Sequence, residues 1–265
     1  MGTTGRINYS YTPDVGSSWV SKNYTSDTNI RSFACGNTPT SILWVAVSNK
    51  NIMYTFNPSD SNPWTSVDES RSYSNVAFGY DTVGAPLWVV TADSSGDDIL
   101  CMHDPTDPSG WIRTKIFSNV AYAIAYGKTV IGTNIWVAVG DDSNGNNIKY
   151  SYDPTNINSW TTSYTSIGSQ IYGITYGNDC WVAYGSEGFV YSASPPNNIW
   201  LPGPNIGSTS SFVLGRDNNG NSLWVAATYG GVKCTQDLSS SANTWVIANI
   251  STNSLAFNQI ITPLG

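Results

Sequence analysis

Carboxylate side chains gather in two short stretches that contain glycine, TADSSGDDI and VGDDSNGNNI. The acids are Asp93, Asp97, Asp98, Asp141 and Asp142. Loops rich in oxygen ligands can bind calcium, but the spacing does not fit the EF-hand loop, and solvated turns have the same composition. The two stretches therefore predict either a calcium site, if they meet in the fold, or a pair of solvated turns.

Arginine and tyrosine side chains form a second candidate set, which would bind a ligand. These residue types predominate at recognition hot spots and can stack on sugars or aromatic groups. The candidates stand just before or within strand-like pieces: Arg31, Arg71, Tyr73, Tyr122 and Tyr172. A tyrosine beside a strand often packs in the interior, so core packing is the alternative for each of them.

Familiar catalytic machinery is sparse in this chain. His103 is the only histidine, which excludes a metal site with two His ligands. A solvent-facing strand position is the simpler interpretation of His103. No glycine-rich phosphate loop stands between a strand and a helix, because helix signals are nearly absent. The sequence therefore indicates no catalytic residue.

Charge and hydropathy narrow the range of partners. The net charge of −7 argues against a phosphate-binding surface of lysines and arginines, and so against nucleic acid. No apolar run is long enough for a membrane span and no leader is visible, so we expect a soluble chain with no membrane partner. The four cysteines form no CxxC pair and are expected to be free thiols.

The eleven tryptophans define a repeat across the chain. One series stands in strand-like pieces such as LWVAV and IWVAVG, 44, 48, 45 and 43 residues apart: Trp44, Trp88, Trp136, Trp181 and Trp224. The other series follows a short polar residue by about seven positions: Trp19, Trp64, Trp111, Trp160, Trp200 and Trp245. A period of about 45 residues with β-rich units indicates a repeat architecture.

The second tryptophan series closes a turn. Its copies begin at Thr12, Asn57, Asp104, Asp153, Ser194 and Asp237, and proline follows in the first five. A short polar side chain can accept a hydrogen bond from the backbone two residues on, and proline presets φ for the first turn position. We therefore interpret Asp104, Asp153 and Asp237 as structural turn residues, with the tryptophans packed behind them.

Each repeat contains four strand-like pieces, which predicts a β-propeller blade. The first piece recurs six times, as FACG, VAFG, IAYG, ITYG, FVLG and LAFN, so we expect six four-stranded blades in one all-β domain over residues 1–265. Within such a piece Ile124 and Tyr126 are large, whereas Ala123 and Ala125 are small. Alternation sends the two pairs to opposite faces, where neighbouring blades can interdigitate.

The two ends of the chain complete the count of blades. RINYSYTPDVGSSWV at the start reads as a third and a fourth strand without a first or second, and only NQIITPLG follows the last first-strand motif. The last blade is therefore expected to combine strands from both termini. Closing a ring in this way removes free sheet edges and ties down both ends.

The repeated WVAVG, the YS-x-D turn and the tryptophan behind it resemble the Asp-box, or bacterial neuraminidase repeat, of sialidase-like propellers. TPDVGSSW fits that family's pattern [ST]-x-D-x-G-x-x-W, although most copies have a longer turn with proline. The resemblance implies the fold, with the Asp-box as a structural turn remote from the catalytic centre. Sialidase-like hydrolysis would also require an arginine triad, a Tyr with a Glu partner and an Asp acid.

The candidates for such a site are few. The arginines are Arg6, Arg31, Arg71, Arg113 and Arg216, and the glutamates are Glu69 and Glu187. No arginine stands in the family's Phe-Arg-Ile-Pro context. We therefore expect a non-enzymatic binding or assembly scaffold that recognises a protein or a glycan through its loop faces. A sialidase-like glycan-processing enzyme and a structural component of a virus particle are the alternatives.

Overall fold

The computed structural model describes residues 5–9, 16–18, 20–25, 29–59, 64–68, 71–93, 96–143, 145–165, 170–217 and 219–248. Trp19, residues 12–15 of the turn that begins at Thr12, and the sixth first-strand motif at Leu255 lie outside these residues. The described part contains β-strands and short 3-10 helices of three residues each, and none of its helices is long and apolar enough to cross a membrane.

The strands form five four-stranded antiparallel sheets, here called blades one to five, and one two-stranded sheet. Blade one contains β3 (Ile30–Asn37), β4 (Ile42–Ser48), β5 (Ile52–Thr55) and β6 (Thr65–Asp68). Blade two contains β7 (Tyr73–Tyr80), β8 (Pro86–Ala92), β9 (Ile99–Met102) and β10 (Ile112–Thr114). Blade three contains β11 (Val120–Lys128), β12 (Asn134–Asp142), β13 (Gly145–Ser151) and β14 (Thr161–Thr165).

Blade four contains β15 (Ile171–Gly177), β16 (Cys180–Gly185), β17 (Gly188–Ser192) and β18 (Leu201–Pro202). Blade five contains β19 (Thr209–Arg216), β20 (Ser222–Thr228), β21 (Gly231–Thr235) and β22 (Val246–Ala248). The two-stranded sheet pairs β1 (Gly5–Tyr9) with β2 (Val20–Thr25). The expected four strands per repeat are thus confirmed for five repeats.

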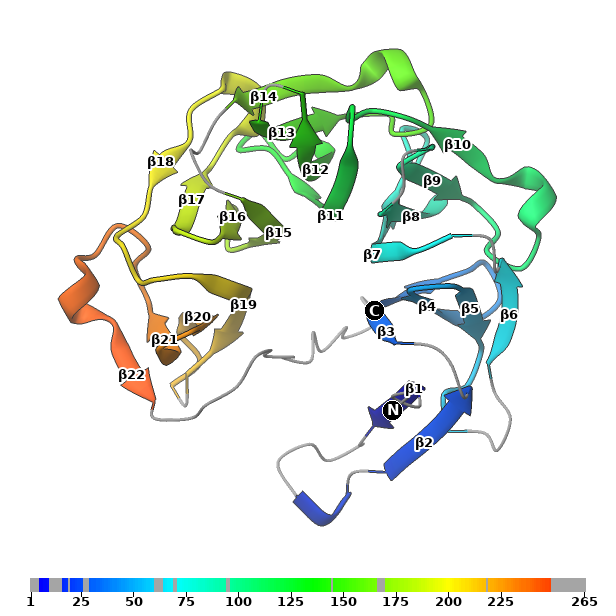
Figure 1. Cartoon of the computed structure of the whole chain (residues 1–265), viewed down its shortest axis with the longest axis horizontal. Helices are drawn as coiled ribbons and strands as arrows, with labels where there is room; N and C mark the ends of the chain where they lie inside the picture. The colour runs from blue at the N-terminus through cyan, green and yellow to red at the C-terminus, as the bar shows by residue number, and fades with distance from the viewer. Residues whose placement is uncertain are drawn as a thin grey trace.

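The blades are arranged radially around a central opening, as in a β-propeller (Figure 1). The first strand of each blade, β3, β7, β11, β15 or β19, lies next to the opening, and the fourth strand lies at the rim. The two-stranded sheet lies beside blade one, where β1 contacts β3. Five full blades and a two-stranded sheet therefore make up the described structure.

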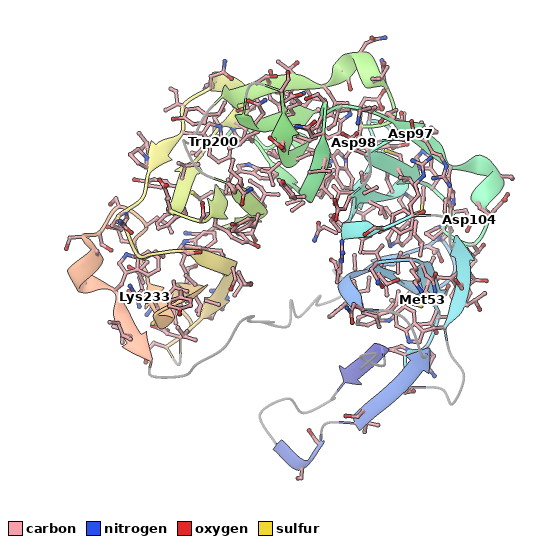
Figure 2. The ribbon with its side chains drawn as sticks, viewed as in Figure 1. Met53, Asp97, Asp98, Asp104, Trp200 and Lys233 are labelled. Atoms are coloured by element: carbon pink, nitrogen blue, oxygen red, sulfur yellow. The ribbon has the colours of Figure 1, made fainter. Side chains whose placement is uncertain are left out.

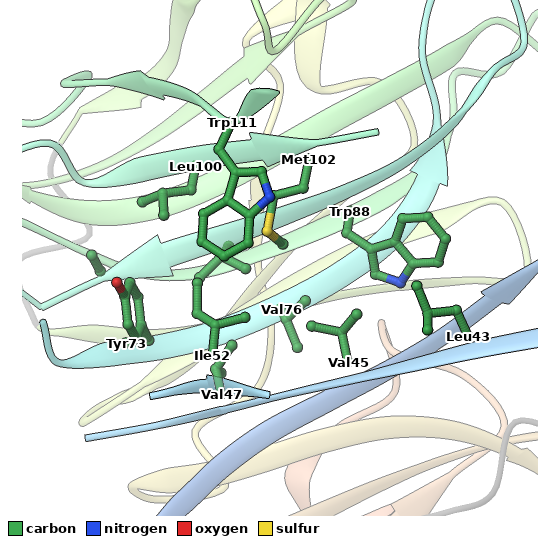
Figure 3. Packing of buried hydrophobic residues seen from close by; sticks show 12 residues of the cluster. Leu43, Val45, Val47, Ile52, Tyr73, Val76, Trp88, Leu100, Met102 and Trp111 are labelled. Carbon is green, nitrogen blue, oxygen red and sulfur yellow. The ribbon is translucent and has the colours of Figure 1, made fainter. Parts of the chain in front are cut away.

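The hydrophobic core is divided among the interfaces between neighbouring blades. Four clusters of buried residues lie between blades one and two, two and three, three and four, and four and five. Figure 3 shows the first of them, in which Val45 and Ile52 of blade one face Trp88 and Trp111 of blade two. Each blade is therefore stabilised mainly by the blades beside it.

The expected alternation of large and small residues is confirmed in β11. Ile124 and Tyr126 pack in the cluster shared with blade two, whereas Ala123 and Ala125 pack in the cluster shared with blade four. The second-strand tryptophans extend this contact, since the Trp136 indole Nε1 donates a hydrogen bond to the carbonyl oxygen of Tyr80 at 3.2 Å. Polar and apolar contacts together fix how one blade sits on the next.

The aspartates of the tryptophan repeat are turn residues, as expected. The Asp153 carboxylate accepts hydrogen bonds from the backbone N–H and the hydroxyl of Thr155, and Asp104 and Asp237 accept the same pair of bonds from the residue two positions on. A 3-10 helix follows in each turn: η2 (Pro108–Gly110), η3 (Ile157–Ser159) and η5 (Ala242–Thr244), with η4 (Pro195–Asn197) at the Ser194 copy and η1 (Gly16–Ser18) in the N-terminal copy. Asp153 is therefore an element of the fold.

The tryptophans behind these turns differ in depth. Trp111, Trp200 and Trp245 are buried, whereas Trp64 and Trp160 are half-buried. In the second-strand series Trp88, Trp136, Trp181 and Trp224 are buried and Trp44 is half-buried. All four cysteines are free thiols.

Candidate recognition surface at the central opening

Each of the five described first strands carries a β-bulge at the same place, near its start. The register against the second strand shifts between Ile30 and Ser32 in blade one, and shifts at the corresponding position in blades two to five. One residue in each first strand is therefore left out of the ladder. Bulges of this kind re-aim side chains and are common beside functional sites.

The residue at the bulge varies among the five blades: Arg31, Ser74, Tyr122, Tyr172 and Ser210. Three of them, Arg31, Tyr122 and Tyr172, belong to the ligand-binding set that the sequence suggested. The Tyr172 ring is 42% exposed, and its hydroxyl donates a hydrogen bond to Gln170 Oε1 at 3.1 Å. The same β-bulge thus carries a different side chain from blade to blade, along the strands next to the opening.

Tyr73 does not belong to this surface. It is fully buried and packs in the cluster between blades one and two, together with Val76 (Figure 3). In a regular strand two residues three positions apart face opposite sides, but the bulge at Ser74 brings Tyr73 and Val76 to the same side. The expectation that Tyr73 contacts a ligand is therefore corrected to a packing role.

Tyr122 is the centre of the candidate surface. Burial and then the negative charges of Asp141 and Asp93 raise the pKa of its hydroxyl, and Tyr172 contributes to the same shift. These side chains come from blades two, three and four, so the fold brings them together across two blade interfaces. We call Arg31, Asp93, Tyr122, Asp141 and Tyr172 the opening surface.

Arg31 reaches from blade one to blade two. Its guanidinium lies 3.5 Å from the Asp93 carboxylate and donates a hydrogen bond to the carbonyl oxygen of Tyr73. Arg71 makes the corresponding contacts within blade two, with the Asp97 carboxylate at 3.5 Å and the Asp97 carbonyl oxygen at 3.2 Å. The two arginines of the suggested ligand site are thus paired with two aspartates of the suggested calcium site.

Asp97 and Asp98 both precede β9 in blade two (Figure 2), but their roles differ. Asp98 is fully buried, and its two carboxylate oxygens accept hydrogen bonds from the backbone N–H groups of Ile116 and Phe117 at 2.8 and 2.7 Å. Burial raises the pKa of the Asp98 carboxyl, against the opposing effect of these two donors. Asp98 therefore fixes the connection that leads from blade two into blade three.

Asp142 holds the other end of the same connection. Its carboxylate lies 2.7 Å from Lys149 Nζ and accepts a hydrogen bond from the Ser118 backbone N–H at 2.8 Å. Burial favours a higher pKa, but the hydrogen bonds from Lys149 and Ser118 prevail and lower the pKa of Asp142 to about 2. The adjacent Asp141 accepts a hydrogen bond from the Asn119 amide at 3.1 Å.

The five acids of the two stretches therefore do not form one cluster. Within the described ranges, no three His, Cys, Asp or Glu side chains are grouped so that they could hold a metal ion. Asp93, Asp97 and Asp142 pair with Arg31, Arg71 and Lys149, whereas Asp98 accepts hydrogen bonds from backbone N–H groups and Asp141 accepts one from the Asn119 amide. Calcium binding at these loops stays a prediction.

Residue type alone does not mark three residues of the opening region as candidates for binding. Ser74 and Ser210 occupy the bulge positions of blades two and five. The Asn75 amide donates to Ser32 Oγ at 3.0 Å and accepts from the Ile124 backbone N–H at 3.1 Å, which joins blades one, two and three. The odd spacing of apolar residues in the first strands, such as Ile171 and Ile174, could have revealed the bulge.

The remaining candidates for sialidase-like chemistry lie apart from one another. Arg113 lies on the rim strand β10 with its guanidinium over the Trp111 ring, and Arg216 donates to the carbonyl oxygen of Gly220 beyond β19. His103 follows β9, is exposed, and lies 3.7 Å from Asp81. The four arginines whose side chains are described thus do not converge on one site.

Comparison with known proteins supports the fold and leaves the family open. No protein-family model and no curated protein matches the chain. Solved structures are similar over most of its length. A Niastella koreensis GH74 enzyme has a TM-score of 0.56 and 13% identity, over 84% of this chain and 31% of that one, so the chain spans about a third of the enzyme's length.

Two further structures extend the comparison. A chain of a nidogen/laminin complex has a TM-score of 0.56 and 14% identity over 89% of this chain and 88% of that one. YCF48 bound to a D1 peptide has a TM-score of 0.54 and 14% identity over 87% of this chain and 70% of that one. The chain has the β-propeller fold. Identities this low carry no further statement about activity or partners.

Proposed function

We propose that this β-propeller is a non-enzymatic binding scaffold that recognises another protein through the opening surface. The observation that carries the proposal is the set of five bulges. Framework residues recur from blade to blade, whereas the bulge residue changes from Arg31 to Ser74, Tyr122, Tyr172 and Ser210. Varied side chains on a rigid, repeated backbone are suited to recognition.

The chemistry of the opening surface suits an extended polypeptide. Tyr172 and Tyr122 offer aromatic rings with hydroxyl groups, which bind both apolar and polar groups of a partner. The Arg31 and Asp93 side chains are 37% and 47% exposed, so each retains capacity for a charged or polar partner group. Two structurally similar propellers, in the nidogen/laminin complex and with the D1 peptide, are complexes with protein or peptide.

Three probes applied to the purified chain separate the functional classes. A displayed random-peptide library tests protein recognition, a glycan array with calcium or with chelator tests glycan recognition, and a fluorogenic sialoside tests turnover. We expect enrichment of peptides and no turnover. Glycan binding without peptide enrichment would replace the protein partner by a glycan, and turnover of the sialoside would favour the enzyme and overturn the scaffold.

We further propose that the ring has six blades and that both ends of the chain form the sixth. Phe33, on the face of blade one that points away from blade two, is 53% exposed. The equivalent residues of blades three and five, Ile124 and Phe212, are buried against the preceding blade. The contact between β1 and β3 supports the N-terminal strands as the neighbour of blade one. LAFN at residues 255–258 supplies the one first-strand motif not used by blades one to five.

Truncation tests this closure. Removing residues 249–265 is expected to lower Tm, because it would leave the apolar faces of blades one and five exposed to water. Removing only residues 263–265, beyond the motif, is the matched control and should leave Tm unchanged. An unchanged Tm after the longer truncation would argue against the sixth blade.

A further inference from the structure

In blades three, four and five, the tryptophan-repeat turn docks on the preceding blade through its second residue. Pro154 is buried, and its carbonyl oxygen lies 3.4 Å from Cys101 Sγ of blade two. Pro195 is buried in the same way, and its carbonyl oxygen accepts a hydrogen bond from Ser163 Oγ of blade three. In blade five Leu238 takes this position and packs with Val182 of blade four.

Blade five has a pocket at the place where a following blade would dock. Its volume is about 370 Å³, and its lining includes Leu223, Cys234 and Val246 from β20, β21 and β22, with Thr235, Asp237 and Ser240 at the turn. Strand registers identify the location. Cys101 pairs with Val89 and Ile112, and Cys234 pairs with Val225 and Val246 in the same pattern.

Cys234 therefore occupies in blade five the position that Cys101 occupies in blade two. Cys101 contacts the proline of the next turn along the ring. The chain contains six copies of this turn, and five of them, beginning at Asn57, Asp104, Asp153, Ser194 and Asp237, belong to blades one to five. The remaining copy is TPDVGSSW, with Pro13 at the docking position.

We propose that the pocket around Cys234 seats Pro13, so that the turn between β1 and β2 docks on blade five as the turns of blades three, four and five dock on the blades before them. Three observations agree on this occupant. The lining of the pocket includes the apolar side chains of Leu223 and Val246, which suit a proline ring. Cys234 matches Cys101 in register. β1 contacts β3, and Figure 1 shows it on the side of blade one that faces away from blade two.

Thiol cross-linking in the full chain tests the seat. In a Cys35→Ser, Cys180→Ser background, Pro13→Cys is treated with dibromobimane, which becomes fluorescent when both arms have reacted. Each thiolate displaces one bromide ion, so two thioether bonds form between residue 13 and Cys234. The expected result is a fluorescent monomer that is lost in the added variant Cys234→Ser. Thr12→Cys, which keeps the proline, is a second reporter if Pro13→Cys does not fold.

A second position on the same turn provides the matched control for cross-linking from residue 13. Ser17 is exposed in η1, at the far end of the turn from Pro13, and Ser17→Cys is expected to give no fluorescent monomer. Equal cross-linking from residues 13 and 17 would show a loose hairpin and overturn the seat. A fluorescent dimer in place of the monomer would show that the pocket takes the turn of a second copy, which also overturns it.

The docking of Pro13 beside Cys234 rests on the proposed six-bladed ring. A second pair of cysteines tests closure of the ring separately from this docking. In the observed interfaces each first strand's third motif residue packs on the preceding blade's motif glycine, as Leu214 does on Gly177. The pair Gly215→Cys and Phe257→Cys therefore reports closure by the C-terminal strand alone. A link at this pair without one at Cys234 would overturn the seat and leave the ring, whereas absence of both links would overturn both.

Discussion

The ring of Tyr126 lies directly over the α-carbon of Gly79 in the preceding blade. A Cβ added to Gly79 would come within 2.3 Å of that ring, closer than two atoms can pack. The same contact recurs between Phe78 and Gly36 and between Tyr176 and Gly127. The glycine at the end of the first-strand motif in blades one to four therefore provides the space that lets the next blade approach, and this explains the repeated sequence of a large residue followed by glycine.

Substitution of this glycine should weaken the interface. Gly79→Ala is expected to lower the free energy of unfolding by about 1–3 kcal/mol, because the added methyl group must displace the Tyr126 ring. Gly110→Ala is the matched control, since a Cβ at Gly110 meets no atom within 4 Å. Urea denaturation of both variants checks the expectation. Equal stability of the two would contradict the proposed role of Gly79.

The second-strand tryptophans allow a comparison of buried indoles. Trp136 and Trp88 are both fully buried beside an aromatic ring, but only Trp136 Nε1 has a hydrogen-bond acceptor among the described residues. Trp136→Phe is therefore expected to cost about 1 kcal/mol more than Trp88→Phe, because it also leaves the Tyr80 carbonyl oxygen without its donor. Thermal unfolding of the pair measures the difference, and a larger loss for Trp88→Phe would refute it.

Two adjacent aspartates should differ sharply in their effect on stability. Asp98→Ala removes the acceptor of two backbone N–H groups and is expected to cost about 2 kcal/mol or more. Asp97→Ala removes a partly exposed ion pair with Arg71 and is expected to cost less than about 1 kcal/mol. Chemical denaturation decides between them, and similar losses would show that Asp98 does not fix the 116–117 connection.

The ion pair between Asp142 and Lys149 predicts a dependence on pH. The folded pKa of about 2 lies below the unfolded value of about 3.9, so the stabilisation is complete above the unfolded pKa and is lost as the pH falls through about 2. In Lys149→Met the carboxyl should titrate at a higher pH. Carboxyl carbon NMR of Asp142 follows both titrations, and an unchanged midpoint would exclude Lys149 as the cause.

The repeat made much of the fold predictable from sequence. Tryptophan spacing and the polar residue before proline located the strands and turns of five blades, because both features satisfy local packing and turn geometry. Alternation along the strand also predicted that large and small residues lie on opposite faces, as Ile124 and Ala123 do in two different clusters. Assignment of Asp153 to a turn also held, since its carboxylate accepts hydrogen bonds from the backbone N–H and the hydroxyl of Thr155, two residues on.

The opening surface was less accessible to sequence reasoning. Arg31, Tyr122 and Tyr172 were found by residue type, but strict alternation could not detect the bulge that buries Tyr73 and leaves Ser74 out of the ladder. The pairing of Arg31 with Asp93 joins residues 62 positions apart in two blades. Such a contact depends on the angle between blades, and a local pattern of residues cannot predict that angle.

The central claim is recognition through the opening surface, and one affinity comparison tests it most directly. Tyr172 and Tyr152 are both 42% exposed, but Tyr152 follows β13 at the opposite end of the strands. For a peptide selected on the unmodified chain, Tyr172→Ala is expected to raise Kd at least about tenfold, while Tyr152→Ala leaves it unchanged. Loss of binding in Tyr152→Ala with full affinity in Tyr172→Ala would contradict the claim.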